Sequence, residues 1–234
     1  MPTLTLLVGG DAVRVEVNRL LIAGFTGRDP GRVHAHVHEL ELYGIPAPTS
    51  VPAFYCVSPS HVVQSPHVEL RSSTVSGEAE AVLIFPADNL ANSLVAVGSD
   101  LTDRSVERHS IRLAKELPKP ISREAWRYAA VREMWDDLEL ASWVERLETS
   151  GYYQLGRLRE LLPPEEVLES LPDEVRSSLR GTVLLLGTLP ICTDSFRFSE
   201  YFACELRAPD GKRLRCEYTV EFAAGDKWAG RRDP

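Results

Sequence analysis

The chain has 234 residues and a formal net charge of −8 at pH 7, with 34 Asp and Glu against 26 Lys and Arg. This length can bury a substantial core, and the acidic balance argues against a nucleic-acid surface. No apolar stretch is long enough to cross a membrane and no secretory signal is recognisable at the start, so we expect a cytoplasmic protein. The four cysteines lack Cys-x-x-Cys spacing, which favours reduced thiols over a zinc site or a disulfide framework.

The first fifty residues predict strands followed by one helix. Strands are expected at 3–8 and 11–17, joined by a Gly-Gly-Asp turn, and at 19–24. Residues 30–43 place apolar side chains near helical spacing. Asp29 is suited to cap this helix and Pro30 to occupy its first position.

The remainder predicts short strands interrupted by two helical segments. Residues 122–147 contain neither Pro nor Gly and carry apolar residues on one helical face, which indicates a long helix. A second helix is expected at 164–179, with acids early and arginines late. We therefore expect an α+β, mainly β fold, in one domain over 1–234, with strands at 53–57, 68–70, 77–85, 93–97, 182–186, 197–206 and 213–222.

Three acidic residues form the most informative pattern in the chain. Glu78 and Glu80 are one residue apart, so in a strand both side chains leave the sheet on the same side. Two such carboxylates repel each other unless a cation lies between them or one is protonated. Asp100 follows another apolar run, and three oxygen ligands from two segments suit Mg²⁺ or Mn²⁺. The alternative is a polar sheet face followed by an acidic turn.

A histidine and a carboxylate on the first helix form a candidate general base. His36 and Glu39 are three residues apart and share a helical face, where the carboxylate can orient the imidazole. His38 and Glu41 have the same spacing, and a solvated helix is the alternative for both pairs.

Five patches in order resemble motifs of the fumarylacetoacetate hydrolase superfamily. They are the lid-like segment 34–40, the Pro-rich stretch 45–55, the Glu-x-Glu pair at 78–80, the Asp-x-Thr-x-Arg motif at 100–104, and the Gly-Thr-Val-Leu-Leu-Leu-Gly-Thr-Leu-Pro run at 181–190. The resemblance implies a mixed β-sandwich roll, with strands and a lid helix in 1–50 and the roll in 51–224. It also implies a homodimer that binds Mg²⁺ or Mn²⁺ and acts on 2-oxo acids or 1,3-dicarbonyl compounds.

The resemblance also assigns roles to individual residues. It favours His36 with Glu39 over His38 with Glu41, and makes Glu78, Glu80 and Asp100 the metal ligands. Either Lys115, which matches a Leu-Ala-Lys context, or Lys119, which lies closer in spacing, would be the family's lysine, able to stabilise an enolate. Substrate contacts are expected from a further set: Arg104, Thr188, Gly187, Tyr55 and Gln64.

Two departures from the family pattern mark a divergent branch. Ser105 and Glu107 stand where the family often has Asp and Gln, and the segment 122–147 has no clear family counterpart. We expect a metal-dependent hydrolase that cleaves a carbon–carbon bond in an acylpyruvate-like acid. The alternatives are a decarboxylase, dehydratase or isomerase of a 2-oxo acid at the same site, or a non-catalytic ligand-binding protein.

Overall fold

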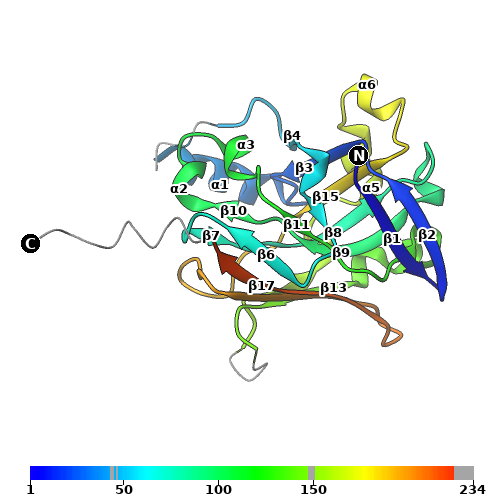
Figure 1. The fold of residues 1–234 in the computed structure, drawn as a ribbon. Coiled ribbons are helices and arrows are strands. Elements are labelled where there is room, and N and C mark those ends of the chain that lie inside the picture. Colours follow the sequence, from blue (N-terminus) through cyan, green and yellow to red (C-terminus); the bar gives the residue numbers. More distant parts are fainter. Residues whose placement is uncertain (43–44, 46, 147–150, 224–234) are drawn as a thin grey trace, which may run out of the picture.

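The computed structural model describes residues 1–42, 45, 47–146 and 151–223. Two β-sheets pack against each other and form most of the molecule (Figure 1). The six-stranded sheet has the order β12 (Trp126–Arg127), β9 (Leu94–Ser99), β8 (Ala79–Ile84), β15 (Thr182–Thr188), β3 (Arg19–Gly24) and β4 (Ala53–Val57). The five-stranded sheet has the order β14 (Gln154–Arg157), β13 (Glu139–Trp143), β16 (Tyr201–Arg207), β17 (Arg213–Phe222) and β6 (His67–Leu70).

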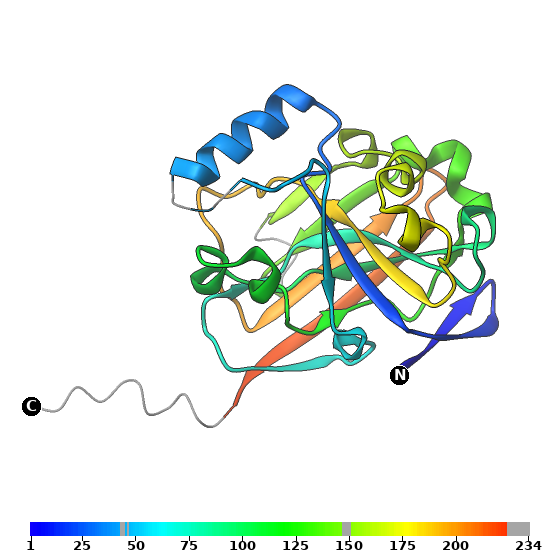
Figure 2. The same ribbon diagram turned by 90° about the horizontal axis from the view of Figure 1, so that it is seen from above.

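Three smaller strand pairs complete the β-structure. A hairpin joins β1 (Thr3–Val8) to β2 (Asp11–Glu16), β7 (Val75–Ser76) pairs with β10 (Thr102–Asp103), and β5 (Val62–Val63) pairs with β11 (Lys119–Pro120). The helices are short apart from α1 (Pro30–Leu42). Among them, α2 (Arg104–Glu107) and α3 (Ile111–Ala114) follow β10, and Figures 1 and 2 place both at the same end of the molecule as α1.

The central strands of the six-stranded sheet are buried on both faces. Along β8, Ala81 and Leu83 belong to the core between the two sheets, whereas Val82 and Ile84 pack in a second core that includes residues of the β1–β2 hairpin. Such double burial explains why this strand is apolar apart from Glu80. A charged side chain within it, as at Glu80, is stable only if polar partners compensate for its lost hydration.

The mainly β, α+β architecture predicted from the sequence is confirmed, and several elements have the expected bounds. The strands β1, β3, β4 and β17 coincide with the predicted ranges. Helix α1 begins at Pro30, where Asp29 Oδ1 accepts a hydrogen bond from the Gly31 amide at 2.9 Å, as the capping pattern predicted. Only Val33 of this helix is buried, so few of its side chains pack against the rest of the protein.

The long helix predicted for 122–147 is wrong. Its described residues, 122–146, form β12, α4 (Tyr128–Val131), the 3₁₀ turn η3 (Arg132–Asp137) and β13, and residue 147 lies outside the described ranges. Strand β13 hydrogen-bonds with β14 and β16 on its two sides and contributes Leu140 to the main core. Sheet pairing therefore overrides the helical spacing of the apolar residues, which serve a turn and a strand instead.

The helix predicted for 164–179 is also divided. It forms α5 (Pro164–Glu169) and α6 (Asp173–Arg176), separated at Pro172. A proline within a helix removes one backbone donor and clashes with the preceding turn. Pro172 was therefore a signal in the sequence for the break.

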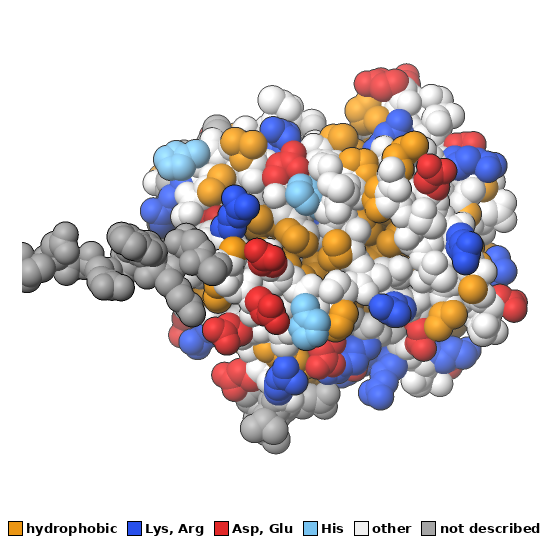
Figure 3. All heavy atoms as spheres, viewed as in Figure 1, with side chains coloured by type: hydrophobic (Ala, Val, Ile, Leu, Met, Phe, Trp, Pro, Cys, Tyr) orange, Lys and Arg blue, Asp and Glu red, His pale blue; other side chains and the backbone are white. Residues whose placement is uncertain are grey.

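Charged groups of both signs are mixed over the face of the molecule in Figure 3, and apolar side chains gather near its centre. Among the described residues on this face, no continuous basic surface of the kind that contacts a phosphate backbone is present. Within the described ranges, every helix falls short of the length and apolar character that a membrane-spanning segment requires.

Truncation of a central core residue tests this architecture. Leu83→Ala removes a fully buried side chain between the sheets, and we expect it to lower the free energy of unfolding by about 2–5 kcal/mol. Leu7→Ala, at a position 45% exposed on β1, is the control and should cost less than about 1 kcal/mol. Urea denaturation measures both, and equal losses would contradict the assigned core.

Candidate metal centre

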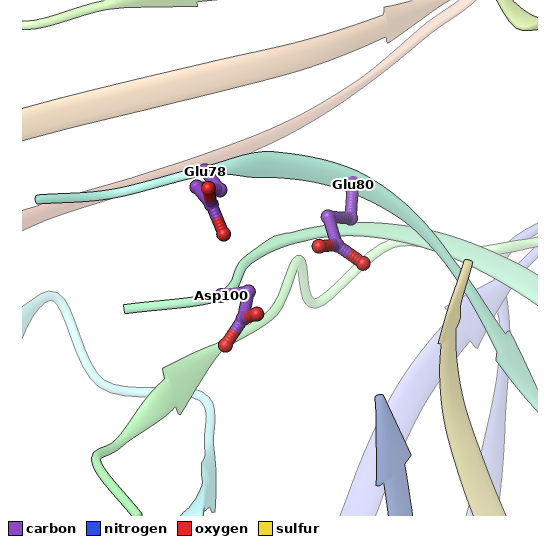
Figure 4. A group of neighbouring side chains, drawn as sticks. All are labelled: Glu78, Glu80 and Asp100. Carbon is purple, nitrogen blue, oxygen red and sulfur yellow. The ribbon is translucent and has the colours of Figure 1, made fainter. Parts of the chain in front are cut away.

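Adjacent antiparallel strands bring the three predicted acids together. Glu78 directly precedes β8, Glu80 lies in it, and Asp100 directly follows β9, its hydrogen-bonded neighbour. The pairing continues beyond the strands, because the Asp100 amide donates to the Glu78 carbonyl at 2.9 Å. Each residue offers a carboxylate oxygen within 4.8 Å of the others, and Figure 4 shows the three groups converging. We refer to these residues as the acidic trio.

The acidic trio has the donor chemistry and the burial of a site for a hard divalent cation. Asp100 is fully buried, Glu80 is 2% exposed, and the Glu78 side chain is 16% exposed. Lys119 Nζ lies at an ion-pair distance of 3.0 Å from Asp100 Oδ1, but its hydrogen bond goes to the Leu101 carbonyl at 2.8 Å. Among the described residues, Asp100 Oδ1 is therefore a buried oxygen without a hydrogen-bond donor. An oxygen in this condition fits a metal ligand.

Three basic residues surround the acidic trio. Lys115 Nζ donates to Asp100 Oδ2 and lies 3.4 Å from Glu78 Oε2, while Lys119 contacts the other oxygen of Asp100. Arg104 binds Glu78 Oε1 at 2.8 Å. The sequence left Lys115 and Lys119 as alternatives, and the structure brings both to Asp100.

The buried environment separates the proton affinities of the two glutamates. Burial alone would raise the pKa of Glu78, but the charges of Arg104 and Lys115 outweigh it and lower the pKa to about 2. Burial raises the pKa of Glu80 well above its ordinary value, and the charge of Asp100 adds to this effect. The partners of Glu78 thus favour its ionised form, whereas burial disfavours the charge of Glu80.

Arg104 pairs with Glu78 and with two further polar side chains. Its Nε donates to Ser76 Oγ at 2.8 Å, and its Nη1 donates to both carboxylate oxygens of Glu107. The guanidinium also lies 3.9 Å from the ring centroid of Phe196. Glu107, at the position where the motif resemblance leads one to expect Gln, is therefore a partner of the arginine. Substrate binding by Arg104 remains a prediction.

A bulged turn of β15 supports Glu80 from the opposite side. The Gly187 amide donates to Glu80 Oε2 at 2.7 Å, and Thr188 Oγ1 donates to the Ala79 carbonyl at 2.8 Å. Gly187 has a φ of +95°, a conformation that glycine adopts without steric cost. The two residues predicted as substrate contacts therefore lie beside the acidic trio and position it.

Sequence reasoning missed Gln154, which links both sheets to this turn. Its Oε1 accepts from the Ala79 amide at 2.9 Å, and its Nε2 donates to Thr188 Oγ1 and the Leu189 carbonyl at 2.7 Å. It lies on β14 of the five-stranded sheet, outside every recognised motif. No local pattern could have identified it, because its role depends on how the sheets pack.

The predicted general base lies apart from the acidic trio. The His36 and Glu39 side chains are 60% and 69% exposed on α1, with Nδ1 and Oε2 3.8 Å apart, and His38 and Glu41 form a similar exposed pair at 3.7 Å. Within the described part of the chain, neither pair contacts the acidic trio. Geometry alone does not favour one pair over the other.

The two remaining predicted residues differ in their relation to the site. Tyr55 lies on β4, which contacts α3 just before Lys115, and burial raises the pKa of its phenol while the charge of Lys115 opposes this rise. Gln64 instead exchanges hydrogen bonds with the Thr5 backbone and donates to the Ser122 carbonyl. The structure therefore does not bring Gln64 to the acidic trio.

Comparison with known protein families assigns the sequence to one of them. Residues 23–218 match the family described as "Protein of unknown function (DUF2848)". The chain belongs to the DUF2848 family. The match includes the acidic trio, its three basic partners and Gln154. A search of curated proteins finds no match to this DUF2848 protein.

Solved structures similar to this DUF2848 protein share its fold at low sequence identity. Fumarylpyruvate hydrolase from Pseudomonas aeruginosa, in complex with Mn²⁺ and pyruvate, is 17% identical with a TM-score of 0.62, over 95% of this chain and 98% of that one. A protein from Oleispira antarctica, assigned in its description as a fumarylacetoacetate isomerase/hydrolase, is 20% identical with a TM-score of 0.63, over 92% and 99%. A 5-carboxymethyl-2-hydroxymuconate delta-isomerase from Mycobacterium smegmatis is 15% identical with a TM-score of 0.60, over 92% and 82%. The β-roll predicted from the motifs is confirmed.

Substitution of Gly187 tests the close packing of the turn beside Glu80. In Gly187→Ala, the new Cβ would lie 2.0 Å from Thr26 Oγ1. We expect a loss of about 1–3 kcal/mol from this clash, in addition to about 1–2 kcal/mol for the left-handed backbone. Gly211→Ala is a matched control, since Gly211 has a φ of +86° and its added Cβ meets nothing within 4 Å. Similar unfolding free energies for the two variants would contradict the close packing of this turn.

Proposed function

We propose that this DUF2848 protein is a divalent-metal-dependent enzyme that cleaves a carbon–carbon bond in a 2-oxo or β-diketo acid of the acylpyruvate type. The observation that supports it most is the buried acidic trio, in which Asp100 Oδ1 accepts no hydrogen bond from the described residues and has the Lys119 ammonium as its ion-pair partner, in a fold shared with a hydrolase solved with Mn²⁺ and pyruvate. Glu78, Glu80 and Asp100 would hold Mg²⁺ or Mn²⁺. When bound, such an ion supplies Lewis-acid stabilisation of negative charge on a substrate oxygen.

The basic residues of the site would orient an anionic substrate. Lys119 is fully buried and fixed by the Leu101 carbonyl, so its ammonium is a preorganised positive charge beside Asp100. Such a fixed charge stabilises an oxyanion that forms nearby. Arg104 would act through Glu78, whose ionised form it maintains.

Hydrolysis additionally requires a base that activates water, and we assign this role to His36 with Glu39. Because both side chains are exposed, this assignment requires α1 to move toward the acidic trio when substrate binds. The same exposure favours a second candidate function, a decarboxylase or isomerase of a 2-oxo acid, which needs only the metal centre and Lys119. The homodimer expected from the family resemblance stays a prediction.

Metal-dependent stability tests the proposed centre. We expect millimolar Mn²⁺ to raise the melting temperature of the wild-type protein, because a ligand that binds only the folded state stabilises it. Glu80→Gln keeps the size of the side chain but removes its charge, and it should abolish most of this gain. Glu69→Gln, at an exposed position on β6, should behave as wild type. An equal Mn²⁺ response in all three proteins would contradict the centre.

Activity measurements separate the two candidate reactions. Acylpyruvates and oxaloacetate would be screened with added Mg²⁺ or Mn²⁺, and the products identified. For a hydrolase, His36→Ala should lower kcat by about 10²–10⁴-fold, the usual contribution of a general base, while His38→Ala should retain activity. Turnover that survives His36→Ala would instead favour decarboxylation or isomerisation. Absence of metal-dependent turnover across the panel would count against the enzyme proposal.

A further inference from the structure

Lys115 differs from the other basic residues of the site because its ammonium lies among the metal-ligand oxygens themselves. It donates to Asp100 Oδ2, and it lies 3.4 Å from Glu78 Oε2 and 3.3 Å from Thr102 Oγ1. Its side chain is only 8% exposed. An ammonium surrounded by side-chain oxygens resembles, in charge and contacts, a cation held by ligands.

Lys119 contacts the same aspartate in a different way. Its hydrogen bond goes to a backbone carbonyl, Leu101 O, and it is fully buried at the start of a strand pair. The described hydrogen bonds of the Lys115 ammonium, in contrast, all go to side chains, those of Asp100, Glu78 and Thr102. Lys119 is thus held by the backbone beside Asp100, whereas the Lys115 ammonium contacts the carboxylates of both Glu78 and Asp100.

The backbone at Lys115 is anchored while its side chain is long and rotatable. Lys115 is the C-cap of α3, and the next residue, Glu116, accepts hydrogen bonds from the Ser58 amide at 3.2 Å and from His61 Nε2 at 3.1 Å. Four methylene groups separate this fixed point from the ammonium. The fold of α3 at this point is therefore held by contacts other than the ion pairs of the ammonium.

The Lys115 ammonium and a divalent ion would compete for the same carboxylate oxygens. A buried carboxylate without a counter-charge is costly, so Lys115 stabilises the acidic trio as long as no other cation is present. A divalent ion bound by the same oxygens would be within a few ångströms of the ammonium, where like charges repel strongly in a buried environment. Lys119 and Arg104 add two further positive charges near Asp100 and Glu78, and Arg104 is shared with Glu107.

We propose that Lys115 is a built-in counter-cation of the metal centre, which a divalent ion must displace from Glu78 and Asp100 in order to bind. This inference rests on the proposed metal centre. It implies that the protein folds stably without metal, and that part of the binding free energy is used to break the Lys115 ion pairs. Removal of the ammonium should therefore tighten metal binding while it destabilises the metal-free protein.

The test is a Mn²⁺ titration of metal-free protein, with free Mn²⁺ measured by electron paramagnetic resonance. We expect Lys115→Met to bind Mn²⁺ about tenfold more tightly than wild type or better, a change equivalent to about 1.4 kcal/mol. Lys115→Arg, which keeps the charge, should bind no more tightly than wild type. Arg108→Met, an exposed residue that removes the same charge close by, should leave the affinity unchanged.

The thermal stability of the same proteins in EDTA provides a second measurement. Lys115→Met should melt below Arg108→Met without metal and should gain more stability from Mn²⁺. Mn²⁺ should also recover folded Lys115→Met protein if this variant does not fold in EDTA, and failure of this recovery would overturn the inference.

The outcomes distinguish this inference from the metal centre on which it rests. If wild type binds Mn²⁺ and Lys115→Met binds with equal or lower affinity, Lys115 is no competitor, although the centre stands. If only Lys115→Met binds, the inference is supported. If neither protein binds Mn²⁺ while Lys115→Met is folded, both the inference and the proposed centre are wrong.

Discussion

The structure depends on the burial of three carboxylates at one end of the β8–β9 pair, on the sheet face that lies away from the five-stranded sheet. Negative charges brought this close, away from water, are stable only when positive charge accompanies them. Lys115, Lys119 and Arg104 supply that charge, each through a different contact with Asp100 or Glu78. The arrangement would be a costly way to build a stable core, so its chemistry, rather than its stability, accounts best for the site.

The surrounding fold fixes the geometry of the acidic trio. The antiparallel pairing of β8 with β9 determines the positions of all three acids, and the bulge in β15 turns the Gly187 amide toward Glu80. Gln154 extends this support across to the five-stranded sheet. Both sheets therefore hold the site, which keeps its oxygens in place before any ligand binds.

Local patterns in the sequence predicted the parts of this arrangement that depend on local geometry. The spacing of Glu78 and Glu80, the apolar run before Asp100, and the cap at Asp29 each follow from the period of one strand or helix. The segment 122–147 misled the prediction because its apolar spacing fits a helix equally well, and only pairing with β14 and β16 selects the strand. Gln154 and the central position of Lys115 arise from packing between distant segments, which no local pattern encodes.

The central claim, that the acidic trio is a divalent-cation site, is tested most directly by crystals of the protein soaked in Mn²⁺ and measured for anomalous scattering. The account predicts one strong anomalous peak in contact with carboxylate oxygens of Glu78, Glu80 and Asp100. A fully soaked crystal with no peak at this position, and the Lys115 ammonium still bound to Asp100, would contradict it.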